Sequence, residues 1–123
     1  MTGEERRARF QRALDYGGNT HEIADVARMV REGRAQWWPQ NNPDSDGMIV
    51  TELLTFPNMR AVNYWLIAGS LPECLGLDAE ITAWAIEQGC TVGMATGRRG
   101  WGRAGAPYGW RPHSYTFVKD LLA

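Results

Sequence analysis

A chain of 123 residues, of which 44% are hydrophobic and 22% charged, has the composition of one globular domain with a buried core, which argues against intrinsic disorder. Its formal net charge of −1 argues against broad, non-specific binding of nucleic acid. The N-terminal MTGEERRARF is charged, and no run approaches the about 18 apolar residues that a bilayer requires. The sequence therefore predicts neither a secretory signal peptide nor a membrane-spanning helix.

Two helices are predicted at the start of the chain. Thr2 and Glu5 form a capping-box pattern before ERRARFQRALDY, which predicts a peripheral N-terminal helix within residues 1–18. Asn19 and Glu22 give a second start signal, and apolar residues then recur at helical spacing up to the next glycine.

Three strands are predicted in the middle of the chain. The segments 37–38, 48–56 and 61–68 are rich in β-branched and aromatic residues. The turn-forming PQNNPDSDG separates the first two, and the short PNMR between the second and third is typical of a hairpin. We therefore expect an antiparallel meander, in which the side chains of Trp37 and Trp38 face opposite ways.

The last third predicts a helix that crosses between two strands. SLPECLGL is predicted to be a loop, and Asp78 opens a helix over about residues 78–88. CTVGMATG, residues 90–97, is expected to be a buried strand, and SYTFVKDLL, residues 114–122, a final strand. Because a strand–helix–strand crossover of this length joins parallel strands, we predict a single α/β domain over residues 1–123.

Two cysteines and two histidines offer little material for a metal site. Cys74 and Cys90 form no CxxC pair, and no pair of histidines lies near them, so we expect no metal. Two buried free thiols are the favoured interpretation, with a disulfide as the alternative. His21 and His113 are expected at the surface.

The segment TGRRGWGRAGAPYGWRP, residues 96–112, contains four arginines, two tryptophans and five glycines. One interpretation is a contact with phosphate or nucleic acid, since Arg binds phosphate in a bidentate manner. A second is a structural corner, in which Arg98 and Arg103 pair with carboxylates and stack on tryptophan. A third, favoured over nucleic acid, is a protein interface, where Trp, Tyr and Arg are enriched. The interface candidates are Arg98, Arg99, Trp101, Arg103, Tyr108, Trp110 and Arg111.

The element order and several motifs resemble a known fold family. A meander of antiparallel strands, then strand, loop, helix, strand and a last strand, is the order found in the GNAT family of N-acetyltransferases. More narrowly, TELLTFPNMRAVNYWLIAG, ITAWAIEQGC and GRRGW with YGW resemble a group of small bacteriophage proteins with a GNAT-like fold, over about residues 20–121. The resemblance implies an α/β (α+β) fold, a twisted mixed sheet with N-terminal helices and a crossover helix at about 78–88.

The resemblance also implies where acetyl-CoA would bind. Working members of the family hold its pyrophosphate on backbone N–H groups of an Arg/Gln-x-x-Gly-x-Gly/Ala loop. ECLGLD is the matching segment here, and its Glu73 and Asp78 replace a cationic or amide residue and a small one. Two carboxylates repel phosphates. If the site is active, the backbone of residues 66–76 holds the cofactor, with binding residues Ile67, Gly69, Gly76 and Leu77.

For catalysis, the resemblance implies a general base and an acid that protonates the departing thiolate. Glu52 in VTELL is the candidate base and Tyr108 the candidate acid. Gly109 and Trp110 match the family's Gly-Phe pair, which places Gly105 at the family's tyrosine position.

We therefore expect a GNAT-like phage protein without acetyltransferase activity that serves as a virion structural or interaction component. Its expected partners are other phage virion proteins or further copies of itself, with no membrane, nucleic acid, cofactor or metal. Its expected location is the virion or the host cytoplasm. The alternative is an active N-acetyltransferase that uses acetyl-CoA to modify an amine.

Overall fold

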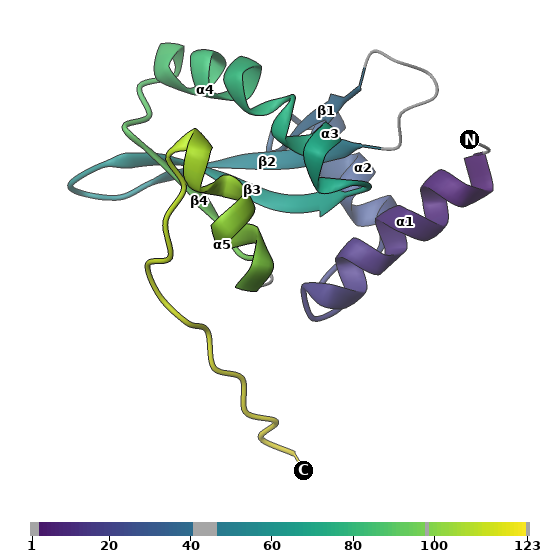
Figure 1. Ribbon diagram of the computed structural model, residues 1–123. Helices are drawn as coiled ribbons and strands as arrows, with labels where there is room; N and C mark the ends of the chain where they lie inside the picture. Colours follow the sequence, from purple (N-terminus) through teal and green to yellow (C-terminus); the bar gives the residue numbers. More distant parts are fainter. Residues whose placement is uncertain (1–2, 41–46, 98, 123) are drawn as a thin grey trace.

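The computed structural model describes residues 3–40, 47–97 and 99–122 (Figure 1). Thr2 and Arg98, both named from the sequence, lie outside the described residues. The described elements are α1 (Gly3–Tyr16), α2 (Ile23–Arg31), β1 (Gln36–Pro39), β2 (Met48–Thr55), β3 (Arg60–Ala68), α3 (Leu71–Leu75), α4 (Asp78–Glu87), β4 (Val92–Ala95), α5 (Arg99–Gly105) and the 3₁₀ turn η1 (Ala106–Tyr108).

The four strands form one mixed sheet in the order β1-β2-β3-β4. β1, β2 and β3 are antiparallel neighbours, which confirms the predicted meander. Phe56 N–H donates to the Met59 carbonyl at 2.8 Å and closes the predicted hairpin. β4 is parallel to β3, as the crossover through α4 predicted.

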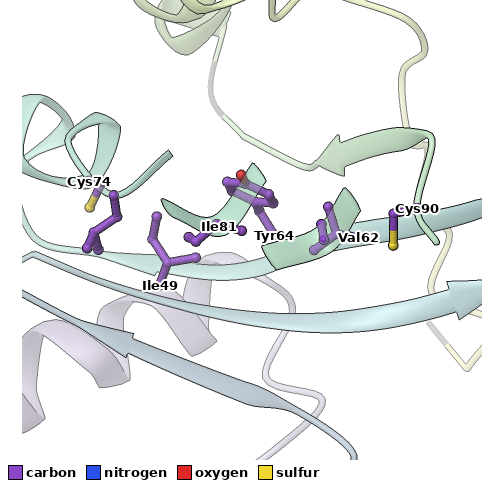
Figure 2. Close-up of a cluster of buried hydrophobic side chains, with 8 residues drawn as sticks. Ile49, Val62, Tyr64, Cys74, Ile81 and Cys90 are labelled. Carbon is purple, nitrogen blue, oxygen red and sulfur yellow. The ribbon is translucent and has the colours of Figure 1, made fainter. Parts of the chain in front are cut away.

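Apolar side chains fill both faces of the sheet. The cluster on the α4 face is drawn in Figure 2, where Ile49, Val62 and Tyr64 of the sheet lie with Ile81 of α4. The cluster on the other face joins α1 and α2 to the sheet through residues that include Phe10 and Leu14 of α1. The expected peripheral helix thus contributes two buried side chains to the core, because its narrow apolar stripe faces β3.

The second helix begins one turn later than its start signal suggested. Asn19 has a φ of +55°, a left-handed conformation that asparagine tolerates and a helix does not use. Glu22 caps the helix instead, and its backbone N–H is bonded to the side chain of Asp25 at 2.9 Å.

The burial of the two cysteines agrees with the favoured prediction, because Cys74 and Cys90 are both buried free thiols.

The region after α4 departs most from the sequence-based prediction. All four residues of β4 are exposed, so the expectation of a buried strand was wrong. Residues 114–122 form no strand, so the predicted final strand was also wrong. An apolar alternating pattern measures suitability for a sheet, but a strand forms only where a neighbouring backbone supplies hydrogen bonds. A short helix, α3, replaces part of the predicted loop SLPECLGL.

Candidate functional site

The parallel strands β3 and β4 separate where β3 carries an extra residue. Val50 pairs with Leu66 while the next residue, Thr51, pairs with Tyr64, so Trp65 is left over as a β-bulge. The pairing of β3 with β4 ends at this position, with Tyr64 opposite Ala95. β3 continues to Ala68 without a partner in β4. The bulge thus marks the point where β3 presents a free backbone edge.

A cavity of about 300 Å³ lies on the α4 face beside the paired part of these strands. Its walls come from β3, α4, the start of β4 and η1, and they include Thr82, Cys90 and Tyr108. The helix supplies one wall, and the chain that follows α5 supplies another. The cavity combines apolar walls with the buried side chains of Tyr64 and Asp78, so it is the candidate ligand site.

A hydrogen bond between two buried side chains lines this cavity. The Tyr64 hydroxyl donates to Oδ1 of Asp78 at 2.7 Å, which links β3 to the first turn of α4. Burial raises the pKa of the Tyr64 hydroxyl well above its ordinary value, and the hydrogen bond to Asp78 raises the pKa further. The tyrosine therefore stays protonated and acts as a donor at neutral pH.

Trp110 forms the outer wall by lying over glycines. Its ring is edge-on to Tyr64, with ring centroids 5.0 Å apart. A Cβ at Gly93 would lie 3.1 Å from the Trp110 ring, and one at Gly105 would lie 3.0 Å from the Trp110 Cβ. Gly109, with φ of +90°, turns the chain so that this ring can enter. Gly93 and Gly105 therefore allow close packing of Trp110, and Gly109 of the YGW motif allows a tight turn.

The structure places the candidate base and acid on opposite faces of the sheet. Glu52 accepts a hydrogen bond from the Asn63 side chain at 2.9 Å, and these residues oppose each other in β2 and β3. Their neighbours Leu53 and Val62 belong to the cluster under α4, so Glu52 and Asn63 project from the other face. Tyr108 lines the cavity on the α4 face and is 54% exposed.

The candidate cofactor residues surround α3. The backbone N–H of Gly76 donates to the carbonyls of Pro72 and Glu73, each at 3.2 Å, and that of Leu77 donates to Cys74 at 3.0 Å. Both amides are therefore engaged within the chain. Of the other two residues, Ile67 packs against the cluster under α4 and Gly69 has a φ of +96°.

The thiol of Cys74 lies directly under this loop. It donates to the Ala68 carbonyl at 3.3 Å and is buried. Burial raises the pKa of the Cys74 thiol to about 11, and the nearby charge of Glu73 adds to the increase. A thiol with this pKa is a poor nucleophile at neutral pH, so the residue has a packing role. Gln40, which the sequence did not single out, donates to the Glu73 carbonyl and ties the end of β1 to α3.

The arginine-rich segment is largely helical and exposed. Arg99 opens α5, and Trp101 lies against Gly97, where a Cβ would be 2.5 Å from its ring. Arg103 and Arg111 are exposed, and neither forms an ion pair with a carboxylate among the described residues. The ion pair predicted for Arg103 in a structural corner is therefore absent from the described part of the chain.

The sequence missed Tyr64 and Thr82 as cavity residues, and it considered Asp78 as a helix-start acid and as part of the ECLGLD loop, not as a partner of Tyr64. The one available signal was the spacing of Val62 and Tyr64, which places their side chains on the same face of a strand.

Elsewhere, the His21 ring packs edge-on against Trp65 with centroids 4.7 Å apart. Across residues 3–40, 47–97 and 99–122, no three His, Cys, Asp or Glu side chains gather as metal ligands. None of the described helices has the length and apolar character needed to cross a bilayer.

No protein-family model matches the chain, and no curated protein matches it. Among solved structures, an acetyltransferase of Trypanosoma brucei matches with a TM-score of 0.67 and 12% identity, over 98% of this chain and 96% of that chain. A mutant of TTHA1254 from Thermus thermophilus matches with a TM-score of 0.64 and 15% identity, over 99% of this chain and 95% of that chain. The wild-type form matches with a TM-score of 0.61 and 16% identity over the same shares.

Identities of this size support a conclusion about architecture, since one fold hosts many functions. The mixed α+β architecture agrees with the fold class that the sequence predicted. The chain has an acetyltransferase-like, GNAT-like fold.

Proposed function

We propose that this protein is a non-catalytic domain of GNAT-like fold that works by contacting other proteins. The observation that carries the proposal is the state of the loop between α3 and α4. Backbone amides bind a pyrophosphate only when they are free to donate to it. The amides of Gly76 and Leu77 already donate to carbonyls of the preceding turn. Redirecting them toward a phosphate would break those bonds.

The charges of the same loop also disfavour the binding of a pyrophosphate. Glu73 and Asp78 flank the amides, and both are carboxylates where a phosphate would sit. Two unit charges 4 Å apart repel by about 1 kcal/mol even in water, and by more at a partly buried site. Asp78 is nearly fully buried against Tyr64, so solvent screens it little. Pyrophosphate binding here would therefore carry an electrostatic cost on top of the lost hydrogen bonds.

The placement of Glu52 and Tyr108 further favours a non-catalytic role. A base and an acid that serve one acyl transfer must both reach the same reacting group, within about 3 Å or through one water. The sheet separates these two side chains, since Glu52 projects away from the cavity that Tyr108 lines.

The contact surface that we propose consists of Arg103, Tyr108 and Arg111, which are exposed on α5, on η1 and just beyond it. Arginine and tyrosine are over-represented at protein interfaces. On the sequence resemblance alone, the partners would be phage virion proteins or further copies of this chain. Peptide mass spectrometry of purified particles tests the virion assignment, and absence of the protein from them would contradict it.

An acetyltransferase is the second candidate, and the bulge at Trp65 favours it. The free β3 edge after the bulge offers backbone groups to an extended, amide-bearing ligand such as the pantetheine arm of acetyl-CoA, in the manner of an added strand. The likeness to the Trypanosoma brucei acetyltransferase agrees with this candidate at the level of fold.

Calorimetric titration with acetyl-CoA separates the two candidates. The non-catalytic proposal expects no binding up to millimolar acetyl-CoA, whereas micromolar binding would contradict it. A working acetyltransferase of the same fold, titrated in parallel, shows that the cofactor and the instrument perform. If binding is found, Gly76→Pro removes one loop amide and tests whether the cofactor sits there. A matched Gly3→Pro change at the start of α1 controls for the general effect of proline.

A further inference from the structure

The C-terminal segment, residues 114–122, is apolar yet uncovered. Beyond Pro112 the described chain adopts neither helix nor strand, and it runs away from the sheet in Figure 1. Its exposed fractions reach 92% at Phe117 and 98% at Leu122. The large exposed apolar side chains of the segment are Tyr115, Phe117, Val118, Leu121 and Leu122. Soluble monomers rarely leave such a stretch in water, so the segment calls for a partner surface.

The edge of β4 is the matching uncovered surface. β4 is the last strand of the sheet, and among the described residues β3 is its one strand partner. Val92 and Met94 on this edge are 38% and 40% exposed. An exposed edge strand presents unpaired N–H and C=O groups and is a template for a further strand. The molecule therefore carries both an unpaired edge and an unpaired apolar segment.

The origin of the segment is fixed, which determines where it can reach. Trp110 is held over Gly93, and the Pro112 ring lies beside Gly102 of α5. Nine extended residues span about 30 Å, more than twice the length of a four-residue strand. Since the segment points away from its own sheet (Figure 1), pairing with a second molecule would require no reversal of its direction.

We propose that residues 114–122 of one copy pair with the β4 edge of a second copy, and that the exchange is reciprocal. A two-fold arrangement satisfies both edges and both segments and leaves no open end. Main-chain hydrogen bonds give the attachment, and alternate side chains cover the exposed face of the edge. This inference goes beyond the proposed function and holds whether or not the domain transfers acetyl groups.

The size and charge of the two surfaces suit a second copy. Two exchanged segments carry ten large apolar side chains, five from each copy. A stable interface needs about 800 Å² from each partner. The two aromatic rings of each segment can bury about 150–250 Å² apiece, and the three aliphatic side chains add to that area. Lys119 and Asp120 cancel within the segment, and β4 has no charged residue, so like copies do not repel each other here.

Measurement of molar mass by light scattering during gel filtration tests the exchange. The full chain is expected to elute with twice the 13.8 kDa of one copy at high concentration. The variant Phe117→Asp with Val118→Asp should elute as a monomer, because charge is placed in the paired segment. The control Trp37→Asp, with Trp38 unchanged, puts one carboxylate on β1, the opposite edge of the sheet, and should remain a dimer, whereas Phe117→Asp alone should not. A wild-type monomer across two orders of magnitude in concentration would overturn the proposal.

Hydrogen exchange followed by mass spectrometry identifies the paired residues. Amides in 92–95 and 114–122 should be protected at high concentration and exchange faster on dilution or in the Phe117→Asp, Val118→Asp variant. Protection that is independent of concentration in a monomer would mean that the segment pairs with its own β4, which overturns the exchange. A dimer that persists in the variant would equally overturn it, since the interface would then lie elsewhere.

Discussion

The chain up to Cys90 and the chain after it are built in different ways. The first region buries apolar side chains on both faces of its strands, in one cluster under α4 and another under α1 and α2. From Thr91 to Leu122, Gly105 alone is buried among the described residues. The second region is attached instead by the pairing of β4 with β3 and by the ring of Trp110, which packs edge-on against Tyr64. Stability therefore resides in the first region, and the surface that is available to partners lies in the second.

The largest effect is expected from a substitution in the first region. Ile81 is fully buried under α4, and Ile81→Ala should lower the free energy of unfolding by about 2–5 kcal/mol. Ile86, on the same helix but 65% exposed, is the matched control, and Ile86→Ala should change it by less than about 0.5 kcal/mol. Urea denaturation followed by circular dichroism measures both. Equal losses for the two variants would contradict the assignment of α4 to the core.

A smaller and local effect is expected from Trp110→Ala. The ring is half-buried, so the loss should be about 1–2 kcal/mol, below the about 3–5 kcal/mol that is typical of a fully buried tryptophan. Amides of α5 and η1 should exchange faster, while those of β2 and β3 keep their protection. Faster exchange throughout the sheet would show that the two regions unfold as one cooperative unit.

A pH-dependent effect should arise in the first region. The pKa of Cys74 is raised from an ordinary value of 9.0 to about 11, so its contribution to stability is complete below about pH 9 and is lost as the pH rises through 11. The raised pKa of Tyr64 adds a loss of the same sign at still higher pH. Thermal melts between pH 8 and about 11 should show Tm falling for the wild type and falling less for Cys74→Ala. An unchanged slope in the variant would refute the role given to Cys74.

The smallest effect is expected on the surface of the second region. Arg103→Ala combined with Arg111→Ala should change the free energy of unfolding by no more than about 0.5 kcal/mol, because neither side chain forms an ion pair with a described carboxylate. The same two changes should weaken binding to a partner if the proposed contact surface is correct. A large loss of Tm would identify the arginines as structural braces.

Local patterns predicted the parts of the fold that local interactions determine. The meander was predictable because alternating apolar residues and the short PNMR turn specify a hairpin, and Phe56 and Met59 close it as expected. The crossover helix was predictable from its acidic first turn and apolar face. The final strand failed because its formation depends on a distant backbone, and residues 114–122 carry the pattern of a strand without a neighbour.

The candidate site was less predictable for a related reason. A motif identified Gly76 and Leu77, but no pattern reveals that their amides are already bonded within the chain. Alternation along a strand predicts faces only if the register is known, so the separation of Glu52 from Tyr108 was not visible in the sequence. Tyr64 and Asp78 lie fourteen positions apart, and only the crossover of α3 and α4 brings them together.

The extra residue in β3 changes which positions of that strand are equivalent. Before Trp65, even-numbered residues such as Tyr64 face α4, and after it the odd-numbered Ile67 does. Deletion of Trp65 would therefore restore a regular alternation and leave residues 66–68 on their present faces, with Leu66 on the face of α1 and Ile67 on the face of α4. Any alignment with a relative that has an unbroken strand must carry a one-residue gap at position 65, or every later residue of β3 will be compared with the wrong side of the sheet.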